Sequence, residues 1–346
     1  MGFSILFGGL SYEHEISIVS AITLKQRLGN KIANYIFVDS NHDFYLIDAA
    51  CMTSKFFSDG SYKQAPRLEL GLSGFFTRGL LGKKPLDVGV VINLIHGADG
   101  EDGMLAGLLD FFGVRFIGPR LEGSVLSYNK RLTKLYARDR GVKTLPFSLH
   151  RLGAPIPSLD SFPVIVKPLR LGSSLGVSVV KAASELEYAL EVAYEFDSEV
   201  LIEPFMPGIK EYNLAGAKVG EEFIFSIVEE PAKKELLGFE EKYLDFSRSG
   251  QVSQANLSDG IRSKLQKAFM DLYDGVFEGA LIRCDFFVMD DEVFLNEINP
   301  VPGSLANYLF DDLFVVLDRL ASSLPSRKNI RVGYQYIHKI QKAKGK

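Results

Sequence analysis

Cysteine is scarce in this chain and tryptophan is absent: the 346 residues include only Cys51 and Cys284. Two cysteines do not make a disulfide framework, so we expect a reducing compartment, the cytoplasm. Long apolar runs are also missing. The apolar opening MGFSILFGGL lacks a basic leader and soon reaches Glu13 and Glu15. We therefore predict a buried strand there, and neither a signal peptide nor a membrane segment.

Charge of one sign does not dominate either. Lys and Arg number 39 and Asp and Glu 43, so the formal net charge of -4 gives no general field that would attract nucleic acid or an anionic membrane. No G-x-x-x-x-G-K-[ST] motif occurs, and no G-x-G-x-x-G follows the first strand, which disfavours P-loop NTPases and standard dehydrogenases. With 47% hydrophobic and 24% charged residues, the composition is that of a folded protein of two or three domains.

Alternating strands and helices predict the fold of the first third. Strands are expected at residues 3–8, 36–38 and 88–94, and helices at 16–28 and 104–112. This alternation is typical of a mostly parallel, doubly wound α/β sheet. Residues 48–85 show poor periodicity, and we expect an irregular insertion there.

The pattern changes after Gly118, and a new unit is expected to begin near residue 119. A basic helix is predicted at 129–140 and a strand at 144–150, followed by a strand, loop and strand over 163–180. The remaining expected elements are strands at 200–203, 212–219 and 223–228, a helix at 261–277, and a hairpin of 280–289 with 293–298 around Asp290-Asp291.

The segment from Lys167 to Gly176 has the composition of a phosphate-binding loop. A lysine at a strand end is followed by two glycines and by Ser173 and Ser174. Backbone amides and hydroxyls of such a loop can surround phosphate oxygens while the lysine supplies a positive charge. An ordinary hairpin turn would account for the glycines and serines equally well.

Two strands near the carboxyl end carry the strongest chemical signal. Alternation places Arg283 and Asp285 on one face of the first strand, and Glu297 and Asn299 on one face of the second. Three oxygen ligands beside a guanidinium suit Mg²⁺ and a phosphate group. The alternative is a surface charge ladder, but Asp285 and Glu297 lie in apolar strands, where an unpaired charge is costly.

Two further loops follow predicted buried strands. The loop from His96 to Gly103 is rich in glycine and acid, and doubly wound sheets bind ligands at such strand ends. After the first strand, Glu13 lies at a helix start and could bind an ammonium group. A solvated turn and a helix cap are the alternatives for these two segments.

These segments together resemble the D-alanine–D-alanine ligase family of the ATP-grasp class. The resemblance rests on GGLSYEHEIS, HGADGEDG, FPVIVKPLRLGSSLGVSVV, EKYLDF, and RCDFF followed by FLNEINPVPG, in that order, and covers nearly the whole chain. It implies an α/β ATP-grasp fold with an N-terminal, Rossmann-like substrate domain at residues 1–118. A central ATP-grasp subdomain would span 119–203, and a C-terminal subdomain with the metal site would span 204–346. A homodimer is the family expectation.

The resemblance also implies roles for individual residues. The catalytic group would be Glu13, Ser173, Tyr243, Arg283 and Gly303, with Arg283 and the Gly303 amide stabilising an oxyanion. Substrate contacts would come from Glu13, His96, Tyr308 and Leu309, and ATP contacts from Lys130, Lys167, Ser174, Glu203, Pro204, Met206, Glu211 and Lys242. Asp285, Glu297 and Asn299 would bind two Mg²⁺ ions, with Mn²⁺ as a substitute.

The implied reaction joins two D-alanine molecules for peptidoglycan precursor synthesis. ATP would phosphorylate the first D-alanine, and the amine of the second would attack the acyl phosphate to give the dipeptide, ADP and phosphate. Three residues depart from the family pattern: Leu171, Pro204 and Tyr308 replace its common Glu, Lys and Ser.

Two alternatives remain open from the sequence. A sister ligase would join D-alanine to a hydroxy acid or to another amino acid. The hydroxy-acid branch resembles Lys-His where this chain has Lys242-Tyr243, which argues against that branch. A catalytically silent nucleotide-binding protein would have lost at least one of the four residues around the expected metal site, and all four are present.

Overall fold

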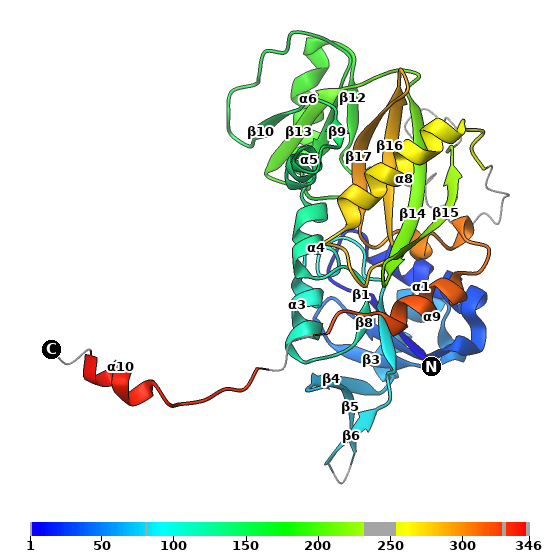
Figure 1. Cartoon of the computed structure of the whole chain (residues 1–346), viewed down its shortest axis with the longest axis vertical. Coiled ribbons are helices and arrows are strands. Elements are labelled where there is room, and N and C mark those ends of the chain that lie inside the picture. Colours follow the sequence, from blue (N-terminus) through cyan, green and yellow to red (C-terminus); the bar gives the residue numbers. More distant parts are fainter. Residues whose placement is uncertain (1, 80–81, 232–253, 327–329, 344–346) are drawn as a thin grey trace.

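A computed structural model describes residues 2–79, 82–231, 254–326 and 330–343. Three sheets organise them: an eight-stranded sheet in the lower part of Figure 1, a four-stranded sheet at the upper left and a five-stranded sheet at the upper right. Helices pack against each sheet. Among the described residues, no helix is both long enough and apolar enough to cross a membrane.

The parallel part of the eight-stranded sheet matches the alternation in the sequence. Strand β1 (Phe3–Gly8) is buried along its whole length and pairs in parallel with β2 (Ile32–Val38) and β7 (Val90–Asn93), and β7 pairs in parallel with β8 (Phe116–Ile117). Helix α1 (His14–Leu28) connects β1 to β2, and α3 (Met104–Phe111) connects β7 to β8. Both expected helices are therefore confirmed.

The expectation of an irregular insertion over residues 48–85 is wrong. The chain forms an antiparallel meander that extends the same sheet, with β3 (Phe44–Ile47), β4 (Arg67–Gly71), β5 (Gly74–Gly79) and β6 (Gly82–Leu86). Short helices α2 (Ser54–Ser58) and η3 (Ser61–Gln64) lie between β3 and β4. Strands β4 to β6 bury few side chains, so apolar and polar residues alternate only weakly in their sequence.

The four-stranded sheet is antiparallel throughout and has the order β10 (Ser148–Arg151), β13 (Glu199–Pro204), β11 (Val164–Pro168), β12 (Ser178–Val180). The expected pairing of the strands on either side of the glycine loop is confirmed by β11 and β12. Helix α6 (Leu186–Tyr194) covers the apolar face of this sheet.

One expected strand, 144–150, is two strands in different sheets. Strand β9 (Lys143–Thr144) pairs with β17 in the five-stranded sheet, whereas β10 pairs with β13. Pro146 lies between β9 and β10 and has no backbone N–H to donate, so one continuous ladder is interrupted there.

The five-stranded sheet has the order β15 (Glu222–Glu229), β14 (Lys210–Val219), β16 (Ile282–Met289), β17 (Glu292–Asn299), β9. Helix α8 (Asp259–Tyr273) packs on one face, and α4 (Leu121–Tyr128) and α5 (Lys130–Asp139) contact β17. The turn between β16 and β17 has φ values of 47° at Asp290 and 60° at Asp291, which confirms the expected hairpin.

The chain then returns to the eight-stranded sheet. The turn η5 (Gly303–Leu309) contacts α1, and α9 (Leu313–Ser322) packs into the hydrophobic core beneath β1 and β7. The tail that carries α10 (Ile337–Ala343) extends away from the body (Figure 1). One continuous core joins residues from both ends of the chain, so η5, α9 and the residues flanking the β16–β17 hairpin, Leu281 and Val301, are held against the eight-stranded sheet.

Candidate active site

The β16–β17 hairpin brings four polar side chains together. Its register sets Asp285 opposite Glu297 and Arg283 opposite Asn299. Arg283 donates from Nε to Asp285 Oδ1 at 2.6 Å and from Nη2 to Oδ2 at 2.8 Å, and Asn299 Nδ2 donates to the same Oδ2 at 3.0 Å. Burial alone would lower the pKa of Arg283, but the adjacent Asp285 carboxylate raises it well above its usual value, so Arg283 stays charged.

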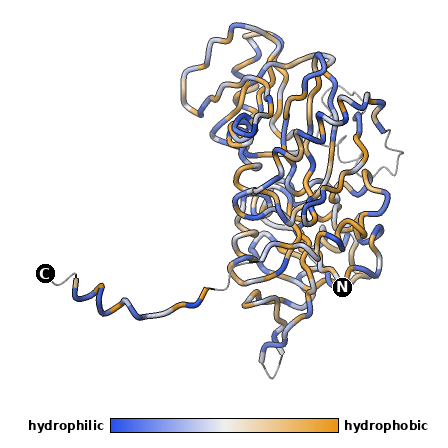
Figure 2. The backbone as a smooth tube through the Cα atoms, viewed as in Figure 1, coloured by the Kyte–Doolittle hydropathy of each residue, from blue (hydrophilic) through white to orange (hydrophobic). Residues whose placement is uncertain are grey.

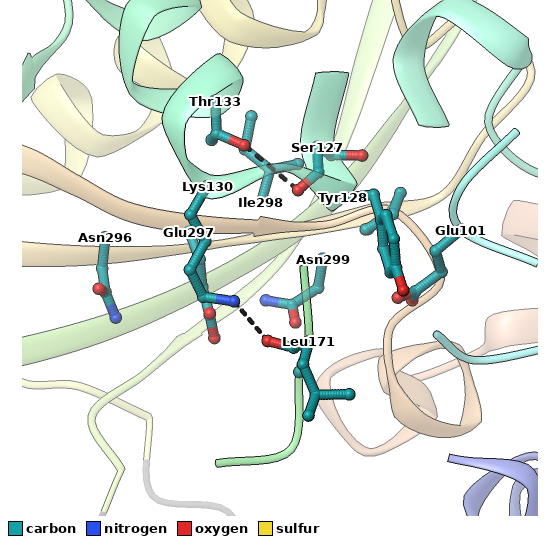
Figure 3. A pocket seen from close by; sticks show the side chains of 12 residues that line it. Glu101, Ser127, Tyr128, Lys130, Thr133, Leu171, Asn296, Glu297, Ile298 and Asn299 are labelled. Atoms are coloured by element: carbon teal, nitrogen blue, oxygen red, sulfur yellow. Dashed lines mark hydrogen bonds between the residues drawn. The ribbon is translucent and has the colours of Figure 1, made fainter. Parts of the chain in front are cut away.

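A cavity opens beside this hairpin. Figure 3 shows Glu297 and Asn299 of β17 facing it from one side, with Lys130 beside them and Tyr128 and Glu101 at the other end. Residues of α4, the start of α5, the glycine loop and the loop after β7 all contribute to its wall. The cavity therefore lies where the three sheets meet.

Three lysines surround the inner end of β13. Glu203 is buried, and its carboxylate accepts from Lys167 Nζ at 2.5 Å and pairs with Lys134 Nζ at 2.8 Å. Lys130 Nζ donates to the carbonyl of Leu171. Burial raises the pKa of Glu203, but Lys167 and Lys134 outweigh that effect and lower it, so the carboxylate is held ionised. This cluster supplies a local positive region in an otherwise acidic chain.

The predicted adenine and ribose residues lie at the edge of the same region. Glu203 and Pro204 end β13, Met206 follows with 39% of its surface exposed, and Glu211 lies on β14. The Glu203 carboxylate points to lysines in this structure, which leaves Met206 as an accessible apolar side chain on the segment between the two sheets.

The glycine loop lies against Glu13. Ser173 Oγ donates to Glu13 Oε1, and a Cβ placed on Gly172 would lie 3.0 Å from that oxygen. Ser173 and Ser174 have φ values of 54° and 58°, a left-handed conformation that turns the loop toward the N-terminal sheet. Ser173 and Glu13 are 160 residues apart in sequence, and the structure joins them directly.

Glycine is required at one position facing Glu13. A Cβ on Gly97 would approach Ser11 Oγ at 2.3 Å and Glu13 Oε2 at 2.7 Å. Gly97 also has φ of 71°. The loop after β7 can therefore approach the start of α1 only with glycine at residue 97. Burial raises the pKa of Glu13, and the bond from Ser173 opposes that shift.

His96 is buried in the loop after β7, with its Nδ1 3.9 Å from Oε1 of Glu101, a residue of the cavity wall. Its Nε2 lies 3.0 Å from Ser20 Oγ, and Ser20 Oγ also accepts from the backbone N–H of Ser304 at 3.1 Å. Burial lowers the pKa of His96 to about 4, so the imidazole is neutral at physiological pH. His96 therefore links α1 to η5 as a hydrogen-bonding group and not as a cation.

Titration of His96 makes stability depend on pH. The folded state keeps His96 neutral down to about pH 4, whereas the unfolded chain binds the proton below its ordinary pKa of 6.5, so stability is lost as pH falls from 6.5 toward 4. At pH 5 this loss is about 2 kcal/mol. His96→Gln should remove it: in denaturant unfolding, wild type should lose about 2 kcal/mol more than the variant between pH 7 and pH 5. An equal loss in both proteins would contradict the assignment.

The turn η5 places the remaining predicted residues. Tyr308 OH lies 3.5 Å from Arg283 Nη1, and burial raises the pKa of Tyr308 to about 12. The Leu309 side chain is buried in the N-terminal core, so only its backbone can reach a ligand. Gly303 precedes three residues with φ near +50°, Ser304 to Ala306, a conformation that costs energy in non-glycine residues and is typical of functional sites.

Sequence reasoning gave no role to two side chains of the site. Lys134 lies one helical turn after Lys130 on α5, and that spacing is the signal that could have found it. Glu101 lies in the HGADGEDG loop; its Oε2 accepts from the Gly97 N–H at 3.2 Å, and burial raises its pKa well above the usual value. Lys242 and Tyr243, which the sequence assigned to the site, lie outside the described residues.

Known proteins match the chain over its full length. The family profile for the D-ala D-ala ligase N-terminus matches residues 3–119, and that for the D-ala D-ala ligase C-terminus matches residues 150–314. The chain is 59% identical over 346 residues to a D-alanine–D-alanine ligase of Wolinella succinogenes, with both chains fully covered, and 54% identical over 350 residues to one of Helicobacter hepaticus, again with full coverage.

Solved structures match as well. A crystal structure of D-alanine–D-alanine ligase from Helicobacter pylori superposes with a TM-score of 0.86 at 52% identity, covering 95% of this chain and 100% of that one. A D-Ala:D-Ser ligase from Enterococcus faecalis, VanG, has a TM-score of 0.73 at 21% identity over 93% of this chain and 97% of its own, a similarity that concerns the fold alone.

Proposed function

This chain belongs to the D-alanine–D-alanine ligase family, and from that premise we propose which of its residues carry out each step. It is an ATP-dependent ligase with the ATP-grasp fold, and it joins two D-alanine molecules to D-alanyl-D-alanine through an acyl phosphate, for peptidoglycan synthesis. The sister ligase and the catalytically silent protein are therefore set aside as alternatives.

The first D-alanine would bind between α1 and the glycine loop. Glu13 is buried and faces the loop, so its carboxylate can accept from the substrate ammonium while Ser173 holds its other side. His96, neutral and buried nearby, can donate to the substrate carboxylate without adding a positive charge. Tyr243 would complete this hydrogen-bonded group. The observation that carries this assignment is the direct contact of Ser173 with Glu13 across two sheets.

ATP would lie between the four-stranded and five-stranded sheets. Lys130 and Lys167 provide positive charge for its phosphates, with Ser174 of the loop and Lys242 as further contacts. The backbone from Glu203 to Met206 would face the adenine, and Glu211 the ribose hydroxyls. The buried Glu203 carboxylate has a second function in this proposal: it fixes the positions of Lys167 and Lys134.

The donor set around the hairpin fits Mg²⁺. Asp285, Glu297 and Asn299 offer only hard oxygen ligands, and the described residues contain no group of three or more His, Cys, Asp or Glu that could hold a metal ion by itself. Mg²⁺ is usually bound by one or two carboxylates together with substrate phosphates and water, so a site that becomes complete only with ATP is the expected form. Two ions would bind here, and Mn²⁺ has the same ligand preference.

The chain's own groups would then stabilise the charge that develops. When bound, Mg²⁺ neutralises phosphate charge and polarises the transferred phosphoryl group. Arg283 and the Gly303 amide would donate to the tetrahedral oxyanion formed when the second amine attacks. The second D-alanine carboxylate would approach Tyr308, which is neutral and donates from its hydroxyl, and the Leu309 backbone. The glycine loop and the segment that contains Lys242 would exclude water from the acyl phosphate.

Domain boundaries, assembly and location complete the proposal. We propose the units 1–118, 119–203 and 204–346, which the spans of the three sheets support except at β9, a strand of the second unit that pairs with β17 of the third. A cytoplasmic location is proposed, because ATP is a substrate and both cysteines, Cys51 and Cys284, are free thiols. A homodimer is proposed from the family resemblance.

A substitution at Glu13 tests the substrate assignment. Glu13→Gln keeps the shape and an acceptor for Ser173 but removes the charge that faces the ammonium. A charge-assisted hydrogen bond contributes about 1.5–3 kcal/mol, so KM for the first D-alanine should rise about 10- to 100-fold while KM for ATP stays close to wild type. Steady-state kinetics with each substrate varied would measure both. The matched control is Glu15→Gln in the first turn of α1. A rise in KM for ATP alone would contradict the assignment.

A further inference from the structure

Lys134 is a buried cation on α5, a largely hydrophilic helix that Figure 2 shows end-on. Only 3% of its side chain is exposed, and its Nζ lies 2.8 Å from Glu203 Oε2. The same Nζ lies 5.9 Å from the centre of the Phe147 ring. Burying a lysine is costly even when its charge is paired, so packing alone does not explain a lysine at this position.

Lys167 lies between Glu203 and the cavity. Its Nζ donates to Glu203 Oε1 at 2.5 Å and to Asn296 Oδ1 at 3.4 Å. Asn296 is one of the residues that line the cavity. Burial alone would lower the pKa of Lys167, but nearby carboxylates, Glu203 first among them, outweigh burial and raise it. Lys167 is therefore a charged group that faces Glu203 and the cavity at once.

Lys134 differs from Lys167 in what it faces. Among the described residues that line the cavity, α5 contributes Lys130 and Thr133 and not Lys134. Burial lowers the pKa of Lys134, and the Glu203 carboxylate opposes that shift. Lys134 is therefore placed to interact with Glu203, and not with a ligand in the cavity.

A buried carboxylate next to a phosphate site needs its own counterion. The Lys167 ammonium carries one positive charge, so it cannot neutralise both Glu203 and a phosphate of ATP. If Lys167 were the only cation at Glu203, phosphate binding would leave a buried carboxylate uncompensated, which is strongly unfavourable. Lys134 supplies the second positive charge, because it pairs with one carboxylate oxygen of Glu203 while Lys167 pairs with the other.

We propose that Lys134 is a positioning residue for ATP: it neutralises Glu203, and the charge of Lys167 is thereby available to a phosphate. The inference rests on the proposed function, in which the phosphates lie beside Lys130 and Lys167. It assigns a role in nucleotide binding to a side chain that acts through Glu203 and Lys167 and does not line the cavity.

Calorimetric binding of ATP and of adenosine, at one fixed Mg²⁺ concentration, tests the proposal, because adenosine carries no phosphate. In Lys134→Met the dissociation constant of ATP should rise about 10- to 100-fold, the range expected for loss of one charge-assisted hydrogen bond. The constant for adenosine should stay unchanged, which also shows that the variant is folded. Lys134→Arg keeps the charge and should bind ATP more tightly than Lys134→Met. Arg131→Met, which removes an exposed positive charge from the same helix, is the matched control and should leave both constants unchanged.

A second substitution separates charge compensation from other roles of Lys134. Glu203→Gln removes the carboxylate that needs the counterion, so adding it to Lys134→Met should return the ratio of the adenosine to the ATP dissociation constant toward the wild-type value. The ratio cancels any contact of residue 203 with the base. In the presence of Lys134, Glu203→Gln should change the ratio less. A ratio that stays low in the double variant would show that Lys134 attracts phosphate directly, and equal losses for ATP and adenosine would show that it only shapes the site. Either result would overturn the proposal, and so would unchanged ATP binding in Lys134→Met.

Lys167→Met distinguishes the role of Lys134 from the placement of ATP. This variant should also lower the ratio of the adenosine to the ATP dissociation constant, because Lys167 would contact a phosphate. An unchanged ratio would show that the phosphates do not lie beside Lys167, which would overturn the proposed ATP site together with this inference. A ratio that Lys167→Met lowers and Lys134→Met leaves unchanged would overturn the role of Lys134 alone.

Discussion

Glu297→Ala should abolish dipeptide formation at every Mg²⁺ concentration. Glu297 lies opposite Asp285 and lines the cavity between the lysine cluster and Asn299. A magnesium site of this kind depends on one or two carboxylates, and its remaining ligands come from phosphates and water. Glu297→Ala therefore removes one of two negatively charged ligands, and a higher Mg²⁺ concentration cannot compensate for that loss.

Asn299→Ala gives the graded counterpart of that experiment. Asn299 is neutral, so its loss removes one oxygen ligand and the bond to Asp285, but no charge. We expect the Mg²⁺ concentration for half-maximal activity to rise about tenfold, which corresponds to about 1.4 kcal/mol. The control is Glu292→Ala, at the far end of the same strand, where the side chain is exposed and pairs with Lys143. Phosphate release and dipeptide formation, titrated with Mg²⁺, would measure all three. Superimposable titrations of Asn299→Ala and wild type would reject the ligand assignment.

The metal hairpin could be predicted from sequence because its signal is local. Alternation alone orients Arg283 with Asp285 and Glu297 with Asn299, and an acid within a strongly apolar strand is conspicuous. The register that sets Asp285 against Glu297 follows once the tight turn at Asp290-Asp291 is recognised. The buried strands β1 and β7 could also be predicted from a local signal, because nearly every residue in them is apolar.

The elements that sequence reasoning missed depend on partners far along the chain. Strands β4 to β6 form at the solvent-exposed edge of their sheet, so they bury only a few residues such as Leu68 and Phe75. Strand β9 owes its existence to β17, about 150 residues later. Lys134 gains its role from Glu203, a contact between a helix and a strand of another sheet. The spacing of Lys134 from Lys130 indicates that the two lysines share a helix face, but no local pattern identifies a distant partner such as Glu203 or β17.

Arg283→Ala should lower kcat about 10²- to 10³-fold while changing KM for ATP little. Arg283 is partly buried and charged, and its guanidinium lies between Asp285 and Tyr308. Loss of one oxyanion donor carries a cost of that size in other enzymes, because the interaction is made in the transition state and not in the ground state. Arg283→Lys keeps the charge but cannot reproduce the two parallel bonds to Asp285. Its kcat should therefore lie between those of wild type and Arg283→Ala.

The ion pair with Asp285 adds a second, opposite effect. Both Asp285 oxygens accept from Arg283 in this structure, so the guanidinium competes with Mg²⁺ for the same carboxylate. Without Arg283, half-maximal activity should require less Mg²⁺ even though kcat is lower. Isothermal Mg²⁺ titrations in the presence of a non-hydrolysable ATP analogue would separate binding from turnover. Arg319→Ala, which removes an exposed arginine paired with Glu222, is the control for loss of a positive charge. A near-normal kcat would remove Arg283 from the chemistry, whereas a low kcat with weaker Mg²⁺ binding would show that Arg283 supports the metal ligands and does not compete for them.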